Sequence, residues 1–558
     1  MKKTICLISS LLLAGMTATA QTSPLYYNSF DDAATGRLSE KTIDKHNNKF
    51  LFGPEYAKGI KGLSLDMSED AVTRVPAVVD SVLTPDYRKS FAFSVWIKTK
   101  PGARQGTPII GNKRNYDFMP QAHTEFRHVC DDADGTKYNE WAMPGWLAGT
   151  TETGAWYFYI SDGQKQYIYY PTAERQRIND GEWHLISGSV DMDKKEVWLY
   201  KDGRNVAIIN TEEIDAPVTD LATVVGGSDE YCEPPIWEAQ REWVAFNGYV
   251  DEAKLWSRAI TSEEVRNEYS SMLPEKIEKT PDSAPTSLKI QTWNILHGGK
   301  RYGEYVGLKR VCEVLAADRS DIIGLVETYG SGAVLADSLG YYYYLISDNL
   351  SILSRYPIVS TYKFYKAFKS GGVMIDLGGG QKIKVFDIWL DWRGHSYQKI
   401  DVEELKKAGF PELVAGDIPC IAFGDFNTTS HLDCDLSLKK NQERFYEETQ
   451  SRFMESLGFT DSYRHLRPDY VRNPGYTWGI TMYNRKEQRQ LNRVDYIYYK
   501  GEEFMPFNTE IVCHHPVYWP SDHASLITWF KFYPIRTDVQ ESVQAPSKQD
   551  KKTRKVKP

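Results

Sequence analysis

The feature of the sequence that most constrains the fold is an apolar run that ends in two polar side chains. Residues 419–427 read Pro-Cys-Ile-Ala-Phe-Gly-Asp-Phe-Asn, a pattern typical of a buried β-strand. Side chains two positions apart in a strand point the same way, so we expect Asp425 and Asn427 to lie side by side. A carboxylate can take a proton from an attacking water while an amide holds water or a phosphate oxygen. The run therefore predicts a catalytic site at the end of a strand.

Two earlier apolar runs in the same half of the chain also end in polar residues. Residues 288–294 predict a strand that ends at Asn294, and residues 321–327 predict one that ends at Glu327. A helix-like stretch around residues 308–315 precedes the second run. Hard divalent cations prefer anionic oxygen ligands, and Glu327 offers one. The competing interpretation is an ordinary surface glutamate that follows a strand.

Two later segments add another carboxylate and a histidine. Residues 491–499 predict a strand that contains Asp495, and Asp522 and His523 are adjacent before a final strand. An aspartate in a strand or a histidine in a loop is usually structural, so each segment alone is weak evidence. Their value lies in the order in which all the segments occur.

The first half of the chain follows a different pattern. Short runs such as residues 91–97 and 196–200 alternate at a period of two and are broken by Asp-Gly turns. This pattern predicts an all-β sandwich. Residues 259–265 predict a short closing helix, with Thr261 or Ser262 at its N-cap and acidic residues in the first turn.

Length and composition favour two domains. The 558 residues are 41% hydrophobic and 25% charged, which is ordinary globular composition for a chain too long to form one domain of roughly 100–200 residues. A polar, proline-containing stretch predicts a linker, and the basic C-terminal residues predict a disordered tail. The predicted layout is a signal peptide at 1–20, an all-β domain at 24–270, a linker at 271–287, a catalytic domain at 288–535 and a tail at 536–558.

The N-terminus has the layout of a cleavable signal peptide. Two lysines precede an apolar run over residues 5–13, and small residues follow up to Ala20. A membrane anchor needs about 20 apolar residues, and this run is nearer half that length. Cys6 lies too close to the start to carry a lipid after cleavage. We therefore expect no transmembrane segment and export to a periplasmic or extracellular space.

The remaining six cysteines lack the paired spacing of a thiolate zinc site. An oxidising compartment permits disulfides, whose pairing the sequence does not assign. The formal charge of -8 is uneven, with about -11 before residue 286, about -1 in 286–535 and about +4 after it. Because the catalytic half carries no basic excess, a nuclease that grips long duplex DNA is disfavoured.

In the first half, a Gly-Glu-Trp-His strand, a Lys-Asp-Gly turn and a closing Gly-Tyr-Val-Asp-Glu-Ala segment together resemble a laminin-G-like, concanavalin A-like jelly roll. Such modules often bind glycans or proteins, and some hold a structural Ca²⁺. The resemblance therefore suggests Asp31 and Asp251 as calcium ligands. The simpler interpretation places both aspartates in strand turns. For Trp237, Trp243 and Trp256 we favour core packing over stacking on sugars.

In the second half, the Gly-Asp-Phe-Asn and Ser-Asp-His segments, together with the earlier strands, resemble the endonuclease/exonuclease/phosphatase superfamily. That superfamily includes DNase I-like nucleases, sphingomyelinases and inositol-polyphosphate phosphatases. The resemblance implies an α+β, DNase I-like fold of four layers, in which a β-sandwich is flanked by helices. It also implies a divalent cation: Mg²⁺, or alternatively Mn²⁺ or Ca²⁺. The implied roles are metal binding for Glu327, Asn294 and Asp522, water activation for Asp425, phosphate binding for Asn427, and an imidazolium contact from His523, held by Asp495.

The sequence departs from the superfamily pattern at one central position. Many members carry a histidine in a Thr-His-Leu context where this chain has Trp389, and an indole cannot shuttle protons. Arg393 and His395 follow closely enough to take over that role at the substrate, although both also fit an exposed loop. Leu296 stands where some relatives have a further acid, which places a second metal in doubt.

The expected function is that of an exported, metal-dependent phosphoester hydrolase. Its lectin-like partner domain and near-neutral catalytic half favour sugar phosphates or phosphorylated glycans over nucleic acid. The alternatives are an extracellular nuclease and a non-catalytic glycan-binding or adhesion protein. The sequence leaves the oligomeric state open.

Overall fold

A computed structural model describes residues 23–31, 54–71, 74–103, 106–113, 143–227, 245–277, 281–438, 449–480 and 491–533. The predicted signal peptide, the predicted tail, Trp237 and Trp243 lie outside these residues.

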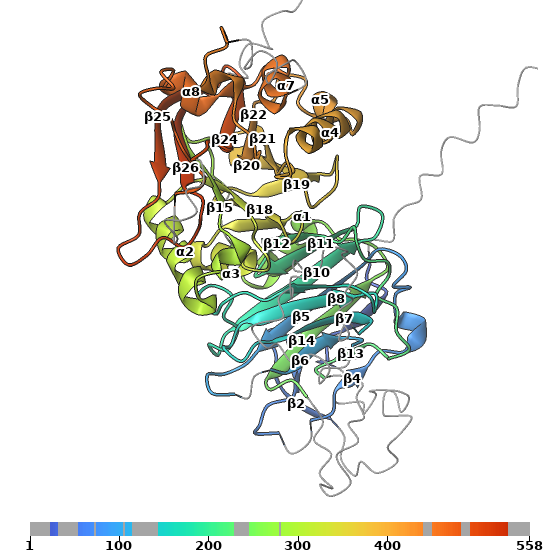
Figure 1. Ribbon diagram of the computed structural model, residues 1–558. Coiled ribbons are helices and arrows are strands. Elements are labelled where there is room, and N and C mark those ends of the chain that lie inside the picture. Colours follow the sequence, from blue (N-terminus) through green and yellow to red (C-terminus); the bar gives the residue numbers. More distant parts are fainter. Residues whose placement is uncertain are drawn as a thin grey trace, which may run out of the picture.

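The first half of the chain forms a sandwich of two β-sheets (Figure 1). The strands of one sheet, in spatial order, are β2 (Glu55–Lys58), β3 (Leu63–Asp66), β14 (Tyr249–Trp256), β5 (Phe91–Lys98), β10 (Trp183–Asp191), β11 (Glu196–Lys201) and β12 (Arg204–Asn210), with β1 (Tyr26–Asn28) paired to β14. Those of the other are β4 (Ala77–Val78), β13 (Val224–Val225), β6 (Pro108–Gly111), β7 (Gly145–Thr150), β8 (Trp156–Ser161) and β9 (Gln166–Tyr169).

Aromatic side chains fill the space between these two sheets. Phe93 of β5 stacks on Trp146 of β7 and Phe158 of β8, with ring centroids 4.9 and 5.9 Å apart. Helix α1 (Ser262–Met272) covers the outer face, where Tyr269 stacks on Trp96. The side chain of Thr261 caps this helix, as the sequence predicts. The predicted all-β sandwich is thus confirmed.

The second half is also built around two facing sheets. One continues, in spatial order, with β17 (Tyr342–Leu345), β18 (Leu350–Ser354), β16 (Ile322–Val326), β15 (Ser287–Asn294), β26 (Ser525–Phe532) and β25 (Phe504–Val512). The other contains β19 (Ile358–Tyr362), β20 (Ser370–Gly378), β21 (Gln381–Ile388), β22 (Cys420–Asp425), β24 (Asp495–Lys500) and β23 (Thr460–Asp461).

A glycine allows the two central strands of this sandwich to come close together. A Cβ at Gly324 of β16 would lie 1.9 Å from the ring of Phe423 in β22, so no larger residue fits there without displacing the ring. The apolar faces of the sheets merge around this contact into one buried cluster. Close packing of this kind fixes the positions of the strand ends.

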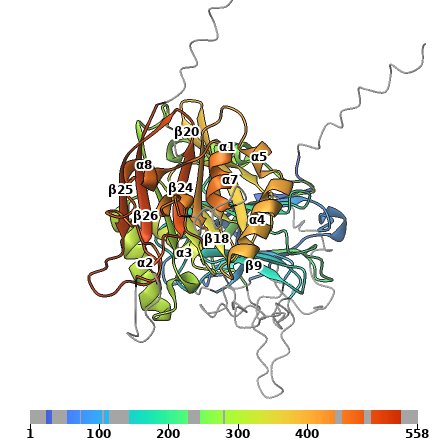
Figure 2. The ribbon, with the colours of Figure 1, turned by 45° about the horizontal axis from the view of Figure 1, so that its top comes forward.

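Helices cover both outer faces of the second sandwich. On one face lie α2 (Glu304–Asp318) and α3 (Gly332–Leu339), and on the other lie α4 (His395–Lys407), α5 (Phe410–Leu413) and α7 (Gln450–Ser456), while α8 (Ser462–Leu466) packs near β24 and β25. Figure 2 shows α2 and α4 on opposite sides of the strands. The order of helices, sheet, sheet and helices confirms the predicted four-layer fold.

The two halves share one continuous β-sheet. Strand β12 of the first half pairs in parallel with β17 of the second, with Ile208 opposite Tyr344 and Ile209 opposite Leu345. The result is a 14-stranded sheet that runs through both halves. The amide of Asn210 adds a hydrogen bond of 3.1 Å to the carbonyl of Ile346. The two domains are therefore joined by backbone pairing in addition to the linker.

Among the helices that the structure describes, none combines the length and the apolar character needed to cross a membrane. Cys312, Cys420, Cys434 and Cys513 form no disulfide with one another. Cys130 and Cys232 lie outside the described residues.

Candidate active site

Polar strand ends from both sheets of the second half meet at one edge of the sandwich. Strands β15 and β16 are parallel, with Asn294 opposite Val326, so Asn294 and the following Glu327 emerge at the same edge. In the facing sheet, Asp425 at the end of β22 is directly opposite Asp495 at the start of β24. The register of four strands thus brings together residues that are up to 201 positions apart.

Asn294 links the two sheets across this edge. Its Nδ2 donates to Oε1 of Glu327 at 3.1 Å and to Oδ2 of Asp425 at 3.2 Å. Its Oδ1 accepts from the amide of Leu296 at 3.0 Å, which fixes the NH₂ group toward the carboxylates. In this orientation Asn294 positions two anionic groups.

The arrangement of Asp425 and Asn427 differs from that of neighbours along a strand. Strand β22 ends at Asp425, and Asn427 has a positive φ of 50°. The amide N–H of Asn427 donates to Oδ1 of Asp425 at 2.9 Å, and its side-chain Nδ2 donates to the carbonyl of Leu390 at 2.9 Å. The turn brings both residues to the site, but Asn427 is held against Leu390, in the segment that follows β21, and not beside Asp425 at a period of two.

His523 and Asp495 form a buried ion pair behind Asp425. Nδ1 of His523 lies 2.9 Å from Oδ2 of Asp495, and both side chains are almost fully buried. Burial alone would lower the pKa of His523, but the charges of Asp495 and Asp425 outweigh it and raise that pKa to about 10. Burial raises the pKa of Asp425, although the cationic His523 opposes this shift. The imidazole is therefore cationic at neutral pH.

The other ring nitrogen of His523 faces the reaction site. Its Nε2 lies 3.8 Å from Oδ2 of Asp425, which is beyond hydrogen-bonding distance. An oxygen atom between a cationic N–H and a carboxylate would contact both groups. The pair therefore suits a water molecule or a phosphoryl oxygen.

Strained backbone gathers in the loops that form the site. Besides Asn427, positive φ angles occur at Leu296, His297, Glu327 and Tyr329, at 55°, 49°, 57° and 37°. Such angles are costly for residues other than glycine and persist where the surroundings enforce them. At Glu327 the enforcing contacts come from Asn349, whose side chain accepts from the Glu327 amide at 3.2 Å, and from the His297 amide, which donates to Oε2 of Glu327 at 3.0 Å.

The donor atoms at the site fit a hard divalent cation. Oδ1 of Asp495 and Oδ1 of Asp522 are buried without a hydrogen-bond partner in the described structure. Carboxylate oxygens of Asp425 and Asp495 lie within 4.8 Å of each other and of the cationic His523, which is not itself a ligand. Asn294 links Glu327 to Asp425. Carboxylate-rich sites of this kind suit Mg²⁺, Mn²⁺ or Ca²⁺ and not soft metals.

Three supporting residues escaped the sequence analysis. Asn349 holds the backbone of Glu327, Thr477 accepts from the amide of Asp495 at 3.1 Å, and Ser521 donates to the carbonyl of Asn294 at 2.7 Å. Only the position of Ser521 next to Asp522 and His523 offered a signal. The other two lie in segments without a recognisable motif.

Trp389 stands at the central position where many members of the superfamily have a histidine. Trp389 is half-buried against Phe368, with ring centroids 5.6 Å apart, and Nζ of Lys369 lies 5.5 Å from its ring. Arg393 forms two hydrogen bonds to Asp391, of 2.9 and 2.5 Å, and remains about half exposed. The backbone of His395 begins α4, and its side chain lies outside the described part of the structure.

In the jelly roll, Asp31 and Asp251 approach the same β2–β3 turn. Oδ1 of Asp31 accepts from the amide of Leu63 at 2.8 Å, and Oδ2 of Asp251 accepts from the amide of Lys61 at 3.3 Å. Burial raises the pKa of Asp251 to about 7. Both contacts are of the turn-stabilising kind, and a structural Ca²⁺ at these carboxylates stays a prediction.

Two family models match the chain. Residues 292–523 match the model described as the Endonuclease/Exonuclease/phosphatase family, and residues 74–266 match that of the Concanavalin A-like lectin/glucanases superfamily. The second half of the chain is thus an endonuclease/exonuclease/phosphatase domain, and the first half is a concanavalin A-like domain. An uncharacterized protein of Caenorhabditis elegans is 22% identical over 302 residues, which cover 45% of this chain and 94% of that protein.

Similar solved structures align with under half of the chain. A protein of the same family from Beutenbergia cavernae is 16% identical, with a TM-score of 0.35, and the alignment covers 44% of this chain and 72% of that one. An AP endonuclease from Archaeoglobus fulgidus is 20% identical, with a TM-score of 0.35 and coverage of 44% and 99%. The human nocturnin catalytic domain is 18% identical, with a TM-score of 0.34 and coverage of 45% and 96%.

Proposed function

We propose that the protein is an exported, divalent-metal-dependent hydrolase of phosphate esters, and that its substrates are sugar phosphates or phosphorylated glycans. One observation carries the proposal: Asn294 holds two carboxylates together at the edge where a buried, cationic His523 faces Asp425. Phosphoryl transfer depends mainly on positioning and on neutralising spread negative charge. This edge offers groups for both tasks.

Each residue has a role that follows from its contacts. Glu327 and Asp522 would hold the cation, which supplies charge neutralisation at the phosphoryl oxygens when bound. Asn294, whose NH₂ group donates to Glu327 and Asp425, would position these carboxylates. Asp425 orients the attacking water and accepts its proton, because its Oδ2 faces the same space as Nε2 of His523. His523 donates to a phosphoryl oxygen, and Asp495 keeps the imidazole cationic and correctly turned. Asn427, fixed through Leu390, contacts the phosphate.

An exposed aromatic surface beside the site supports a substrate with a ring. Trp392 is 69% exposed, and the guanidinium of Arg393 stacks over Tyr397 at 4.2 Å. The start of α4, which follows Trp392 and Arg393, is tied to the site, since Gln398 donates to the carbonyl of Asn427 at 2.6 Å. A large apolar side chain exposed next to a catalytic edge favours contact with the organic part of a substrate. The near-neutral charge of the half that bears it favours a sugar over a long nucleic acid.

A screen of phosphate release tests the proposal. Mannose phosphates, inositol phosphates, a simple phosphodiester and supercoiled plasmid are each incubated with the protein and Mg²⁺, with and without EDTA. We expect EDTA-sensitive release from sugar phosphates and an intact plasmid. Asp425→Asn should abolish release, whereas Asp417→Asn, which changes an exposed carboxylate in the loop before β22, should not.

The outcomes separate the parts of the proposal. Plasmid nicking without phosphate release would overturn the sugar-phosphate assignment and favour a nuclease. Absence of any hydrolysis would overturn the enzymatic assignment and favour a binding protein. Phosphate release that persists in EDTA would contradict the proposed dependence on a divalent cation.

A further inference from the structure

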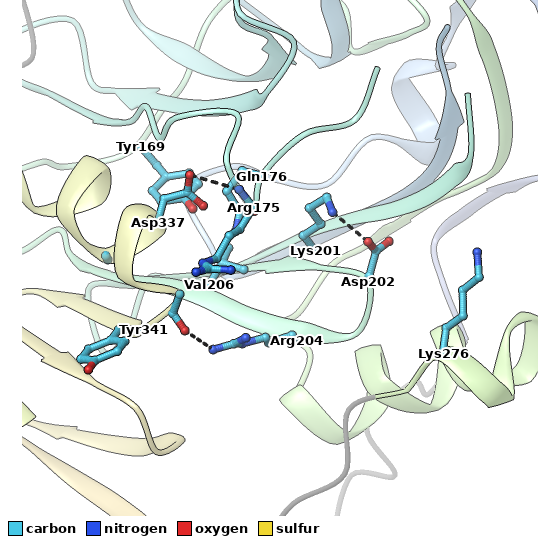
Figure 3. A pocket seen from close by; sticks show the side chains of 12 residues that line it. Tyr169, Arg175, Gln176, Lys201, Asp202, Arg204, Val206, Lys276, Asp337 and Tyr341 are labelled. Atoms are coloured by element: carbon cyan, nitrogen blue, oxygen red, sulfur yellow. Dashed lines mark hydrogen bonds and ion pairs between the residues drawn. The ribbon is translucent and has the colours of Figure 1, made fainter. Parts of the chain in front are cut away.

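A polar cavity lies at the junction of the two halves, away from the candidate active site (Figure 3). Its volume is about 200 Å³, which is smaller than that of a typical pocket for an organic ligand. Its walls come from both domains and the linker. The charged residues that line it are Arg175, Lys201, Arg204, Lys276, Asp202 and Asp337.

The two carboxylates of this cavity both contact protein groups, although Oδ1 of Asp337 is buried without a hydrogen-bond partner in the described structure. Asp202 accepts from Nζ of Lys201 at 2.9 Å and lies 2.8 Å from Nδ1 of His184. Asp337 accepts from the hydroxyl of Thr172 and from the backbone amide of Arg175. Neither acid neutralises the guanidinium of Arg175. The lining therefore carries an excess of positive charge.

The cations differ in how firmly they are held. Arg204 is anchored, with a hydrogen bond of 2.9 Å to the carbonyl of Gly340 and a stacking distance of 4.4 Å to the ring of Tyr342. Arg175 is exposed, and its guanidinium makes no ion pair within the described part of the chain. Among the described residues, Lys276 forms an ion pair with the exposed Glu182, at 3.4 Å. The side chains of Arg175 and Lys276 can therefore turn toward a ligand, whereas Arg204 is already held at the cavity wall.

The walls of the cavity are rigid relative to each other. Directly beside it, β12 pairs with β17, and the contact between Asp337 and Thr172 ties α3 to the first domain. Because the walls are fixed, the backbone positions that carry the cations are already set before an anion binds.

The cavity is separated from the catalytic edge by the length of α3. Ser331, immediately before this helix, lies in the loop that carries Glu327 and donates to the carbonyl of Gly298 in the loop after β15. Asp337 and Gly340, at the other end, line the cavity. Eight helical residues span about 12 Å. A phosphate group at the catalytic edge therefore cannot also occupy the cavity.

We propose that this junction cavity is a binding site for an oxyanion, a phosphate or sulfate group, separate from the site of hydrolysis. Arg175 and Lys276 close on the anion from the first domain and the linker, and Arg204 faces it from β12. The group is either a free ion or a substituent of a glycan that reaches the junction. The proposal goes beyond the hydrolase activity and does not depend on it.

Isothermal titration calorimetry of the full chain in EDTA tests this site. The His523→Gln background removes the catalytic imidazolium, so that neither hydrolysis nor the active-site cation contributes. Inorganic phosphate, inorganic sulfate and mannose 6-phosphate serve as probes. We expect binding, and we expect Arg175→Ala with Lys276→Ala to weaken it at least roughly tenfold, as removal of charge-assisted hydrogen bonds does.

Arg177→Ala is the matched control, because Arg177 is an exposed arginine in the same loop that does not line the cavity. It should leave the affinity within about twofold. Equal affinity for the three probes assigns the site to the oxyanion alone, and tighter binding of mannose 6-phosphate assigns it to a group on a sugar. Absence of binding, or equal losses in Arg177→Ala and in the double variant, would overturn the proposal. Absence of hydrolytic activity would overturn the proposed enzymatic function but not the proposed oxyanion site.

Discussion

The ion pair between His523 and Asp495 leads to the most specific prediction. Asp495→Asn keeps an oxygen that can accept from Nδ1 of His523 but removes the charge. At the observed 2.9 Å, and with an effective dielectric constant of about 20, that charge stabilises the imidazolium by about 6 kcal/mol. The figure corresponds to about 4 pKa units, and the retained hydrogen bond offsets part of the loss. We therefore expect the pKa of His523 to fall by about 3 units, toward neutrality.

The pH dependence of kcat/KM measures this shift. With a chromogenic phosphate ester and Mg²⁺, the alkaline limb of the wild-type profile should lie near the His523 pKa of about 10. In Asp495→Asn it should move to about pH 7. At pH 9 the variant would then keep about 1% of its imidazolium, so activity should fall roughly a hundredfold, with a much smaller loss at pH 6.

A double-mutant cycle controls for general damage to the site. If Asp495 acts through the imidazole, Asp495→Asn should cost little in a His523→Gln background. An unchanged alkaline limb, or losses that add fully in the double variant, would refute the reasoning. Circular dichroism of each variant establishes that the fold is retained.

Three further predictions follow from buried and exposed groups. Burial raises the pKa of Asp387 in the folded protein well above its ordinary value. Above about pH 4 the unfolded chain loses this proton while the folded protein keeps it, so the free energy of unfolding should fall by about 1.4 kcal/mol per pH unit. Asp387→Asn should flatten that slope in denaturant titrations. Trp392→Ala should raise KM for a sugar phosphate several-fold and leave kcat nearly unchanged, and an unchanged KM would remove Trp392 from the substrate surface. Arg493→Met leaves the buried Asp461, 2.7 Å away, without its partner and should cost about 3–5 kcal/mol in chemical unfolding.

The sequence predicted the strands and the polar residues at their ends because both depend on local patterns, whereas the four-layer fold was implied by the family resemblance. Period-two alternation and apolar runs mark strands, and the polar residues that follow Val326 and precede Ser525 stand at strand ends. The structure confirms that these ends meet. Thr261 could be placed at a helix cap for the same reason, since capping is a local interaction.

The sequence could not predict what depends on contacts between distant segments. The pairing of Ile208 with Tyr344 joins residues of two domains, and no local pattern distinguishes an edge strand that pairs with another domain from one that meets solvent. Strand periodicity predicted Asn427 beside Asp425, but the strand ends two residues earlier, at Asp425, and Asn427 has a positive φ. Asn349 supports Glu327 from a loop without a motif.

The measurement that tests the account most directly is the Mg²⁺ dependence of hydrolysis in wild type and in Glu327→Gln. The variant keeps the size of the side chain, and its amide oxygen can still accept from the His297 amide, but it loses the anionic oxygen that a hard cation prefers. The account predicts that the Mg²⁺ concentration for half-maximal phosphate release rises at least roughly tenfold, and that saturating Mg²⁺ restores part of the activity. Identical Mg²⁺ curves for the two proteins would contradict it, because Glu327 would then hold no catalytic cation.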